Sequence, residues 1–440
     1  MSTCREDNIG SAPILPIVFG KNTSVTRLEN GNVHIERDVF GRHLRAILTA
    51  DEALLCALLE RGSDPVDVFG SYPEVLAEIA AKIPRLLTAL RAFIDASGAA
   101  ADLIFSPPSV YFDGAHIMSP KGFTRINREI APRDLVWYAT HRCPRTCRYC
   151  HWVEKGRSDL EPDHLSLDGA RGLVMEAWLG GVERFVITGG EPMLRRDIYD
   201  IISYATDLGL PTWLFTRYNI TPARAERLAA ARITEVYFSL DDITREANAS
   251  MVENVGVADE AIRSLRSLRN ASVQVTVVPV ITRLNASNLV KLVTKLSSVG
   301  VQRIRPICYK GRRGAAVNDL FTLQEEDKRV LVTQLEQAAN LIEIDETTLD
   351  LGAKVGICES GISTLYVQPS GSVSYCPLTS RDSGKPFAHL PRNQLSDIWH
   401  SARLAELLAA NALASASPRE LIRVATASSC ALNHERLDLV

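Results

Sequence analysis

The sequence lacks the features that would direct it to a membrane, to the secretory route or to a polyanion. It has no uninterrupted apolar run long enough for a membrane span, and its first residues, Met1-Ser-Thr-Cys-Arg-Glu-Asp7, are not a secretory signal. The formal net charge is only −3, which gives no electrostatic reason to expect nucleic acid or an anionic membrane as a partner. We therefore expect a cytoplasmic protein with neither kind of partner.

The chain also lacks an even number of cysteines: it has nine, so they cannot all be paired as disulfides within the chain. In a reducing compartment, metal ligation explains them better than disulfides do. With 46% hydrophobic and 23% charged residues, the composition is that of a globular protein with a sizeable core. Its 440 residues predict two or three domains.

Three of the cysteines, Cys143, Cys147 and Cys150, form a C-x3-C-x2-C motif. Four cysteines normally hold a cubane iron–sulfur cluster, so a loop with three leaves one iron open to a substrate or cofactor. Three unrelated buried thiols are the alternative, because free cysteine often packs as a small core residue. The arginines, prolines and polar residues around the motif argue against a core segment.

This loop resembles the signature of the radical S-adenosylmethionine (SAM) superfamily. The resemblance implies that Cys143, Cys147 and Cys150 hold a 4Fe–4S cluster whose open iron chelates SAM. An electron donor such as flavodoxin or ferredoxin would reduce the cluster, SAM would be cleaved to a 5′-deoxyadenosyl radical, and this radical would take hydrogen from an unactivated carbon. The resemblance names no catalytic side chain, and the sequence shows no arrangement that requires a nucleophile.

The resemblance also assigns contacts to SAM. In Thr188-Gly-Gly-Glu-Pro192 it gives Gly189, Gly190 and Glu191 to the SAM amino group, although such a run taken alone is more often a turn. The remaining assignments are Tyr149 against the adenine, Ser239 at the SAM carboxylate, Asp241 near the ribose or substrate, and Thr216, the one match to the Thr-Asn-Gly of relatives. Ordinary loop packing is the alternative for Tyr149, and a helix cap is the alternative for Asp241 or Asp242.

Two departures from the family pattern stand out. Strand three ends in Phe215-Thr-Arg-Tyr218, and the arginine that relatives usually carry beyond the strand-four aspartate is missing, since Met251 lies near its place. Arg245 or Arg283 is a candidate to serve a carboxylate instead.

The order of the predicted elements defines the fold class. Strands are predicted at 135–139, 184–188, 212–215, 235–240, 273–280 and 302–307, with helices between them at 166–180, 195–208, 222–231, 258–270 and 286–299. This alternation predicts an α/β fold with a parallel sheet, and six units predict a partial (β/α)6 barrel over residues 134–345. It is also the fold of the radical SAM superfamily. The cysteine loop follows the first strand, at the end of the barrel where the active sites of such folds lie.

The chain before the barrel is expected to form a small α+β domain over residues 31–105. Residues 1–30 are expected to be irregular, and residues 106–133, rich in Pro, Gly and Ser, a linker. Strands at 33–37 and 43–48, a helix capped by Thr49 or Asp51 with Cys56 in its core, and helices at 72–83 and 84–96 resemble the winged-helix peptide-recognition domain of peptide-modifying enzymes. A purely structural extension is the alternative.

A further helix is expected at 323–341, and residues 346–440 resemble the SPASM and twitch auxiliary-cluster domains. Cys358 precedes a predicted hairpin at 365–376, in which Gly371 is the turn glycine and Cys376 follows it by five positions. The resemblance implies one auxiliary 4Fe–4S cluster held by Cys358, Cys376 and Cys430, with Cys308 or an open position as the fourth. A hairpin with incidental thiols is the alternative.

Enzymes with this domain order mostly modify ribosomally made peptides. The sequence therefore predicts a RiPP (ribosomally synthesised, post-translationally modified peptide) maturase that crosslinks, epimerises or oxidises a precursor peptide. A small-molecule radical SAM dehydrogenase or a cofactor-biosynthesis enzyme is the alternative. A noncatalytic scaffold or electron carrier is disfavoured by the Gly189–Glu191 motif beside the open-iron loop. The basic run Lys310-Gly-Arg-Arg313 is either a solvated loop or a contact for an acidic substrate.

Overall fold

The computed structural model describes residues 17–28, 32–63, 82–95, 103–106, 131–150, 164–252, 256–309, 318–345, 363–374 and 388–401, with 349 and 404. Its contacts divide the chain into two compact units, Met1–Phe123 with Leu179–Gly181, and Thr124–Trp178 with Val182–Val440. Within the described ranges, no helix has the length and apolar character needed to cross a membrane. The domain boundaries at 31–105, 106–133, 134–345 and 346–440 stay predictions.

The first unit contains a three-stranded antiparallel sheet and a helix. The sheet has the order β1 (Thr23–Arg27), β2 (Val33–Val39), β3 (Arg42–Leu48), and α1 (Ala50–Glu60) follows it. Thr49 is the N-cap of α1 and forms a capping box with Glu52, as its place before an apolar run predicts. The prediction that residues 1–30 are irregular is wrong for β1, because this mostly exposed polar strand carries no hydrophobic alternation.

The helices of the first unit agree only partly with expectation. Helix α1 buries Cys56 and its leucines, as predicted. The chain is helical over 82–89 and turns at 90–93, so the helix predicted at 84–96 begins earlier and ends earlier. The helix predicted at 72–83 lies, up to residue 81, outside the described residues.

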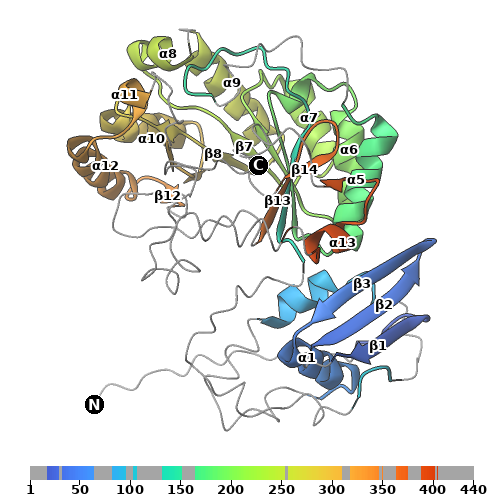
Figure 1. The fold of residues 1–440 in the computed structure, drawn as a ribbon. Coiled ribbons are helices and arrows are strands. Elements are labelled where there is room, and N and C mark those ends of the chain that lie inside the picture. Colours follow the sequence, from blue (N-terminus) through green and yellow to red (C-terminus); the bar gives the residue numbers. More distant parts are fainter. Residues whose placement is uncertain are drawn as a thin grey trace, which may run out of the picture. The chain divides into compact units, whose positions relative to one another are not determined.

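The second unit is built on a parallel sheet whose strands follow one another in chain order (Figure 1). These strands are β4 (Asp134–Tyr138), β5 (Arg184–Thr188), β6 (Thr212–Thr216), β7 (Glu235–Phe238), β8 (Val275–Val277), β10 (Arg303–Ile304) and β12 (Glu343–Ile344). The helices between and after them are α5 (Leu167–Leu179), α6 (Ile198–Asp207), α7 (Pro222–Ala230), α8 (Arg245–Val252), α9 (Val257–Asn270), α10 (Leu289–Ser298) and α12 (Glu325–Ala338). The predicted α/β partial barrel is confirmed, with α8 and β12 as elements that the periodicity missed.

Two predicted strands are broken where a proline interrupts them. The strand predicted at 273–280 is two pieces, β8 and β9 (Val280–Ile281), with Pro279 between them, and the strand predicted at 302–307 is β10 and β11 (Ile307–Cys308), separated at Pro306. Proline has no N–H to donate to the ladder, so each strand leaves the main sheet there. The second pieces pair with each other as a separate parallel ribbon.

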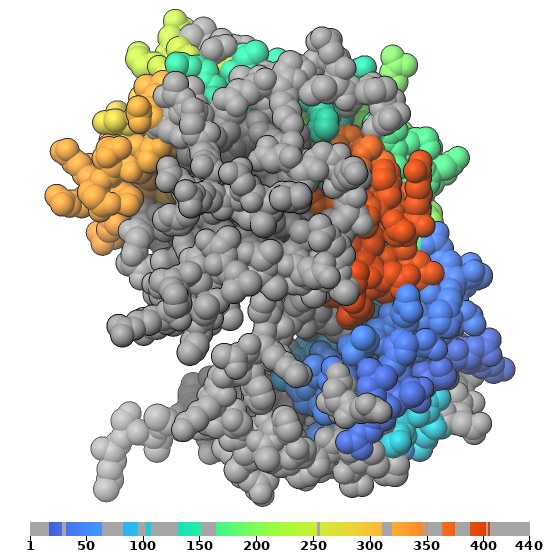
Figure 2. Space-filling model, in the orientation of Figure 1, coloured from blue at the N-terminus to red at the C-terminus, as the bar shows by residue number. Residues whose placement is uncertain are grey.

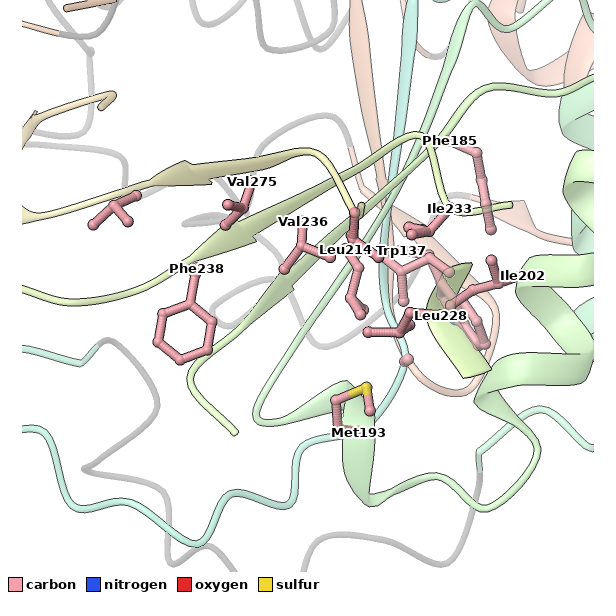
Figure 3. Close-up of a cluster of buried hydrophobic side chains, with 14 of the residues drawn as sticks. Trp137, Phe185, Met193, Ile202, Leu214, Leu228, Ile233, Val236, Phe238 and Val275 are labelled. Atoms are coloured by element: carbon pink, nitrogen blue, oxygen red, sulfur yellow. The ribbon is translucent and has the colours of Figure 1, made fainter. Parts of the chain in front are cut away.

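The sheet buries one of its faces against helices (Figure 3). Alternate residues such as Trp137, Phe185, Leu214 and Val236 are fully buried and form one hydrophobic cluster with helix residues such as Ile202 and Leu228. This period-two burial is what a strand covered by helices on one side requires. The carboxyl ends of the strands are thereby held at one edge of the sheet.

The described part of the C-terminal segment extends the same sheet. Strand β13 (Thr364–Val367) lies parallel beside β4, β14 (Ser372–Ser374) pairs antiparallel with β13, and β15 (Ala388–His389) pairs antiparallel with β14. With helix α13 (Leu395–Trp399), these residues form one orange-red area of the surface (Figure 2). The predicted hairpin and its turn glycine are confirmed, since Gly371 has φ +93° and a Cβ there would lie 2.2 Å from the carbonyl oxygen of Leu390.

Candidate active site

The predicted SAM-site residues follow four neighbouring strands. The cysteine loop leaves β4, Gly189–Glu191 leave β5, Thr216 ends β6, and Ser239 and Asp241 follow β7. Because these parallel strands are adjacent in the sheet, their carboxyl ends meet at one edge. Residues spread over about a hundred positions are thus neighbours in space.

The two glycines fit the end of β5 against the start of the cysteine loop. The amide of Gly190 donates to the carbonyl of Thr140 at 2.7 Å, and the amide of Glu191 donates to that of Arg142 at 2.7 Å. A Cβ at Gly190 would lie 2.2 Å from the Arg142 carbonyl oxygen, and one at Gly189 would lie 2.5 Å from that of Thr140. The glycines are therefore required by the cysteine loop itself, in addition to any ligand.

Glu191 is a buried carboxylate held by three protein donors. Its Oε1 accepts from the Thr216 hydroxyl at 2.6 Å and from the Met193 amide at 3.1 Å, and its Oε2 accepts from the Arg217 amide at 2.9 Å. Burial raises the pKa of Glu191, while these hydrogen bonds oppose the rise. A carboxylate has about four acceptor positions, so about one remains for a cationic group.

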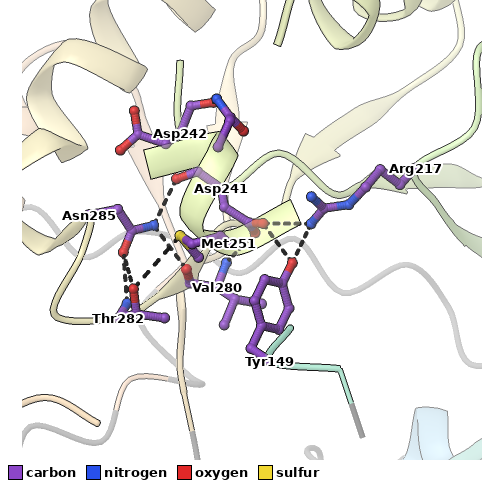
Figure 4. A network of polar contacts seen from close by, with 9 residues as sticks. Tyr149, Arg217, Asp241, Asp242, Met251, Val280, Thr282 and Asn285 are labelled. Atoms are coloured by element: carbon purple, nitrogen blue, oxygen red, sulfur yellow. Dashed lines mark hydrogen bonds and ion pairs between the residues drawn. The ribbon is translucent and has the colours of Figure 1, made fainter. Parts of the chain in front are cut away.

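Asp241 joins the cysteine loop to the neighbouring strand ends (Figure 4). Its Oδ2 accepts from the Tyr149 hydroxyl at 2.6 Å and from Arg217 Nη2 at 2.8 Å, and its Oδ1 accepts from the Val280 amide at 3.0 Å. Arg217 Nη2 also donates to the Tyr149 hydroxyl at 2.5 Å. Burial raises the pKa of Tyr149 well above its usual value, so the phenol stays protonated and donates.

Two arginines of the cysteine loop attach it to helices. The Arg148 amide donates to the carbonyl of Met251 at 2.9 Å and its guanidinium to that of Ser250 at 3.2 Å, at the C-terminus of α8. A cation suits the negative end of a helix dipole. Arg145 pairs with Glu260 of α9. Phe321, in α11 (Asn318–Phe321), and Tyr149 make a T-shaped ring contact with centroids 6.2 Å apart.

The three thiols of the loop are partly buried and act on one another. Burial raises the pKa of Cys143 to about 11, and the charges of Glu191, Cys147 and Cys150 add to the rise. Burial also raises the pKa of Cys147, against the effect of the Arg217 charge. Within the described part of the chain, no three Cys, His, Asp or Glu side chains are grouped closely enough to hold a metal ion. The donor chemistry nevertheless suits iron, because a metal removes the repulsion among neighbouring thiolates.

The remaining predicted residues have varied positions. The Ser239 amide donates to the Thr216 carbonyl at 2.9 Å, and its half-buried side chain has no hydrogen bond to any described residue. The helix-cap alternative suits Asp242, which accepts from the Thr244 amide at 2.6 Å just before α8. Cys308 is buried at the end of β11 in the main core. Cys358, Cys376, Cys430, Cys4 and the basic run 310–313 lie outside the described residues.

The residue that sequence reasoning missed is Arg217. It stands where the sequence departs from the Thr-Asn-Gly of relatives, yet its side chain is 9% exposed and contacts both Tyr149 and Asp241. The two candidates for the family arginine that is missing near Met251 are on the surface: Arg245 is exposed, and Arg283 is 43% exposed and donates to the Asp319 carbonyl. The available signal was the arginine itself, directly after a buried parallel strand.

Comparison with known proteins defines the class. Residues 137–296 match the radical SAM superfamily, and residues 358–430 match the SPASM family, an iron–sulfur cluster-binding domain. The second match begins at Cys358 and ends at Cys430. The chain belongs to the radical SAM superfamily and has a SPASM domain. It is a radical SAM enzyme whose cofactors include a 4Fe–4S cluster and SAM. Its SPASM domain binds auxiliary iron–sulfur.

Its relatives include a peptide cyclase, a maturase and the AdoMet-dependent heme synthase of Nitratidesulfovibrio vulgaris, which is 27% identical over 169 residues and covers 38% of this chain and 46% of the relative. The PqqA peptide cyclase of Granulibacter bethesdensis is 28% identical over 283 residues, covering 62% of this chain and 74% of the relative. The mycofactocin maturase MftC of Mycolicibacterium smegmatis is 29% identical over 288 residues, covering 62% and 71%. SuiB of Streptococcus suis bound to S-adenosylmethionine has the same fold, with a TM-score of 0.58, 14% identity and coverage of 92% and 94%. SuiB has also been determined bound to its precursor peptide SuiA, with a TM-score of 0.56, 15% identity and coverage of 89% and 90%.

Proposed function

We propose that this enzyme modifies a ribosomally made precursor peptide by radical SAM chemistry. The observation that carries the chemical part is the bonding of the C-x3-C-x2-C loop to the Gly-Gly-Glu motif at the carboxyl ends of β4 and β5. The peptide substrate is supported by the relatives, which include the PqqA peptide cyclase and the mycofactocin maturase MftC.

Each residue at the strand ends contacts a different group of SAM or of its cluster. Cys143, Cys147 and Cys150 hold the cluster that leaves an iron open. Glu191, with its remaining acceptor position, receives the ammonium of SAM, and the backbone beside Gly189 and Gly190 approaches the ligand closely. Thr216 holds Glu191 in position, and Asp241 holds Tyr149. The ring of Tyr149 packs against the adenine. The half-buried hydroxyl of Ser239 remains available to a ligand.

When bound, the cluster and SAM supply a radical able to take hydrogen from unactivated carbon. The chain's own residues orient the ligand and exclude water. Apolar side chains cover one side of the loop. Those buried beside Cys147 and Tyr149 are Phe321, Tyr309, Met251 and Val252. Such a covering protects a reactive intermediate from solvent.

The first unit is proposed to bind the peptide. Both β1 and β3 are edges of the three-stranded sheet, and an extended peptide can add to a free edge by main-chain hydrogen bonds. Residues 1–123 make up more than a quarter of the chain, so a structural match to SuiB over 92% of the chain extends into this unit. An external electron donor and a cytoplasmic location stay predictions from the sequence.

The test is an anaerobic assay of the whole protein. After reconstitution with iron and sulfide, the enzyme is given SAM, a reductant and a short peptide encoded beside its gene, and 5′-deoxyadenosine and peptide mass are measured. We expect both deoxyadenosine and a modified peptide. Absence of deoxyadenosine from cluster-loaded protein would refute the SAM chemistry.

A second outcome separates the two substrate classes. Deoxyadenosine without any change in the peptide, with no binding of the peptide by the intact chain, would favour the small-molecule dehydrogenase or cofactor-biosynthesis alternative. Deuterium carried from the peptide into deoxyadenosine would support the peptide directly, because the transferred hydrogen then comes from the substrate.

A further inference from the structure

The face of the barrel sheet that turns away from the helices carries aromatic rings. Trp137, Leu214 and Val236 lie on the helix side, in the hydrophobic cluster (Figure 3). Successive side chains of a strand lie on opposite faces, so the residue after each of these belongs to the other face. These following residues are all aromatic and partly exposed: Tyr138 on β4, Phe215 on β6 and Tyr237 on β7.

Two of the rings stand in one row with a small residue between them. Tyr138 pairs with Thr188 in the ladder between β4 and β5. Ile187 pairs with Leu214 between β5 and β6, so Thr188 and Phe215, one position further on, are neighbours in the same row. The row therefore has a ring on β4, a ring on β6 and only the short side chain of Thr188 between them.

Both rings make their aromatic contacts on the side away from Thr188. Tyr138 stacks on Tyr366 of β13, with ring centroids 6.4 Å apart, and Phe215 makes a T-shaped contact with Tyr237 of β7 at 4.6 Å. Strands β13 and β7 are the neighbours of β4 and β6 on the sides opposite to β5. The partly exposed hydroxyl of Thr188 has no hydrogen bond to any described residue.

This row lies next to the residues assigned to SAM. Gly190 comes two positions after Thr188, and Ser239 comes two positions after Tyr237. The amide of Ala139 donates to the Thr188 carbonyl at 2.8 Å, which ties this end of β5 to the start of the cysteine loop. Reacting atoms must approach to about 3–3.5 Å, so a substrate attacked from SAM has to extend over this row.

The spacing of the rings selects an aromatic side chain. Neighbouring strands are about 4.8 Å apart, so the backbones at Tyr138 and Phe215, two strands apart, are separated by about 9.6 Å. A planar ring midway between them would lie about 5 Å from each, within the range of about 4.5–7 Å at which aromatic pairs attract. We propose that Tyr138 and Phe215 hold an aromatic side chain of the precursor peptide over Thr188, beside the carbon that loses hydrogen. This rests on the proposed peptide substrate.

The experiment measures the preference of the enzyme for a ring in the peptide. The cluster-loaded protein is given the peptide encoded beside its gene, and versions of it in which each aromatic residue in turn is leucine. Modification is followed by mass spectrometry. Two ring contacts of about two- to tenfold each should make one such replacement lower kcat/KM about 5- to 100-fold. Phe215→Leu and Tyr138→Leu should each reduce that preference about two- to tenfold.

Matched variants separate this contact from a structural role. Tyr199→Leu removes a partly buried ring of α6 that lies against Arg227 at 3.7 Å, and it should leave the preference unchanged. Thr188→Leu places a larger side chain under the proposed ring, so kcat/KM for the native peptide should fall about 10- to 100-fold. Its SAM affinity, measured by calorimetry, should stay within about threefold of the wild type. Where Phe215→Leu fails to hold iron, Tyr138→Leu provides the test.

Several results would overturn the inference. A loss of SAM affinity in Thr188→Leu as large as its loss of peptide modification would give this position to SAM. An unchanged preference in both ring variants would show that the ring is needed elsewhere in the peptide, and undiminished modification of a peptide without aromatic residues would exclude the contact altogether. Deoxyadenosine without any change in the peptide would refute the peptide substrate and this inference with it. Absence of deoxyadenosine would refute the proposed function as a whole, which distinguishes the failures.

Discussion

At the scale of single residues, Glu191 and Asp241 are carboxylates buried at nearby strand ends, and each accepts three hydrogen bonds from the protein. Their positions were predictable, because motif spacing places them after parallel strands. Their partners were not, since the choice of Arg217 depends on a side chain that reaches across to the next strand end. Whether two charged side chains are buried against each other depends on the tertiary structure, and a local sequence pattern does not reveal it.

The first prediction concerns the charge of Glu191. Glu191→Gln keeps an oxygen for Thr216 and Met193 but removes the charge and places an NH2 group against the Arg217 amide, so SAM affinity should fall about 10- to 100-fold. Glu235→Gln is the control, because Glu235 is also buried and accepts from Trp213 but lies at the opposite, amino end of β7. Equal affinity losses in the two variants, measured by calorimetry, would contradict a role for Glu191 at the ligand.

The second prediction concerns the raised pKa of Cys143. Since the pKa of the thiol is about 11 in the folded chain, iron-free protein at pH 8 contains almost no thiolate at this position. Alkylation by iodoacetamide should accelerate about tenfold per pH unit and level off near pH 11, not near 9. Mass spectrometry of the modified peptides measures this. Cys56, fully buried in α1, should not react in the folded protein at any of these values.

At the scale of elements, the contact between the end of β5 and the cysteine loop depends on backbone atoms. The sequence predicted most strands and helices of the barrel within a few residues, because buried alternation and amphipathic helices are strong patterns. It did not predict where Pro279 ends β8, nor the two-residue strand β12, nor the polar strand β1. Each of these is defined by pairing with another strand, which leaves no trace in local hydrophobicity.

The third prediction tests that backbone contact. In Gly190→Ala the new Cβ would lie 2.2 Å from a backbone oxygen, which cannot move aside as a flexible side chain can. We expect the cysteine loop to be displaced, iron loading to fall, and the free energy of unfolding to drop by about 1–3 kcal/mol. Iron analysis and denaturant unfolding measure both effects.

The control for this substitution is Gly169→Ala in α5. Its Cβ would meet two side chains and no backbone atom, Leu165 at 3.2 Å and the Ser166 hydroxyl at 3.5 Å, and alanine favours a helix. Iron loading should therefore stay at the wild-type value. A Gly190→Ala protein with full iron loading would show that the loop tolerates displacement.

At the scale of the whole molecule, the radical SAM and SPASM matches occupy different stretches of the chain, and each implies iron. Cys358→Ala combined with Cys376→Ala should lower the iron content by one cluster, about four irons, and leave the spectrum of the SAM cluster in place. Cys56→Ala, in the first unit, should leave the iron content unchanged. Unchanged iron in the double variant would refute the auxiliary site, and a similar loss in Cys308→Ala alone would identify the fourth ligand.

Strand β13 has a consequence for how the chain is divided in experiments. It pairs with β4 along four residues, on the side of β4 that β5 leaves free. A chain cut before residue 346 would therefore expose the unpaired N–H and C=O groups of a hydrophobic strand, Asp134-Leu-Val-Trp-Tyr138, which is a template for aggregation. The segment that contains Cys358 and Cys376 also protects the strand from which the cysteine loop begins. The barrel is consequently expected to remain monodisperse only when that segment is present.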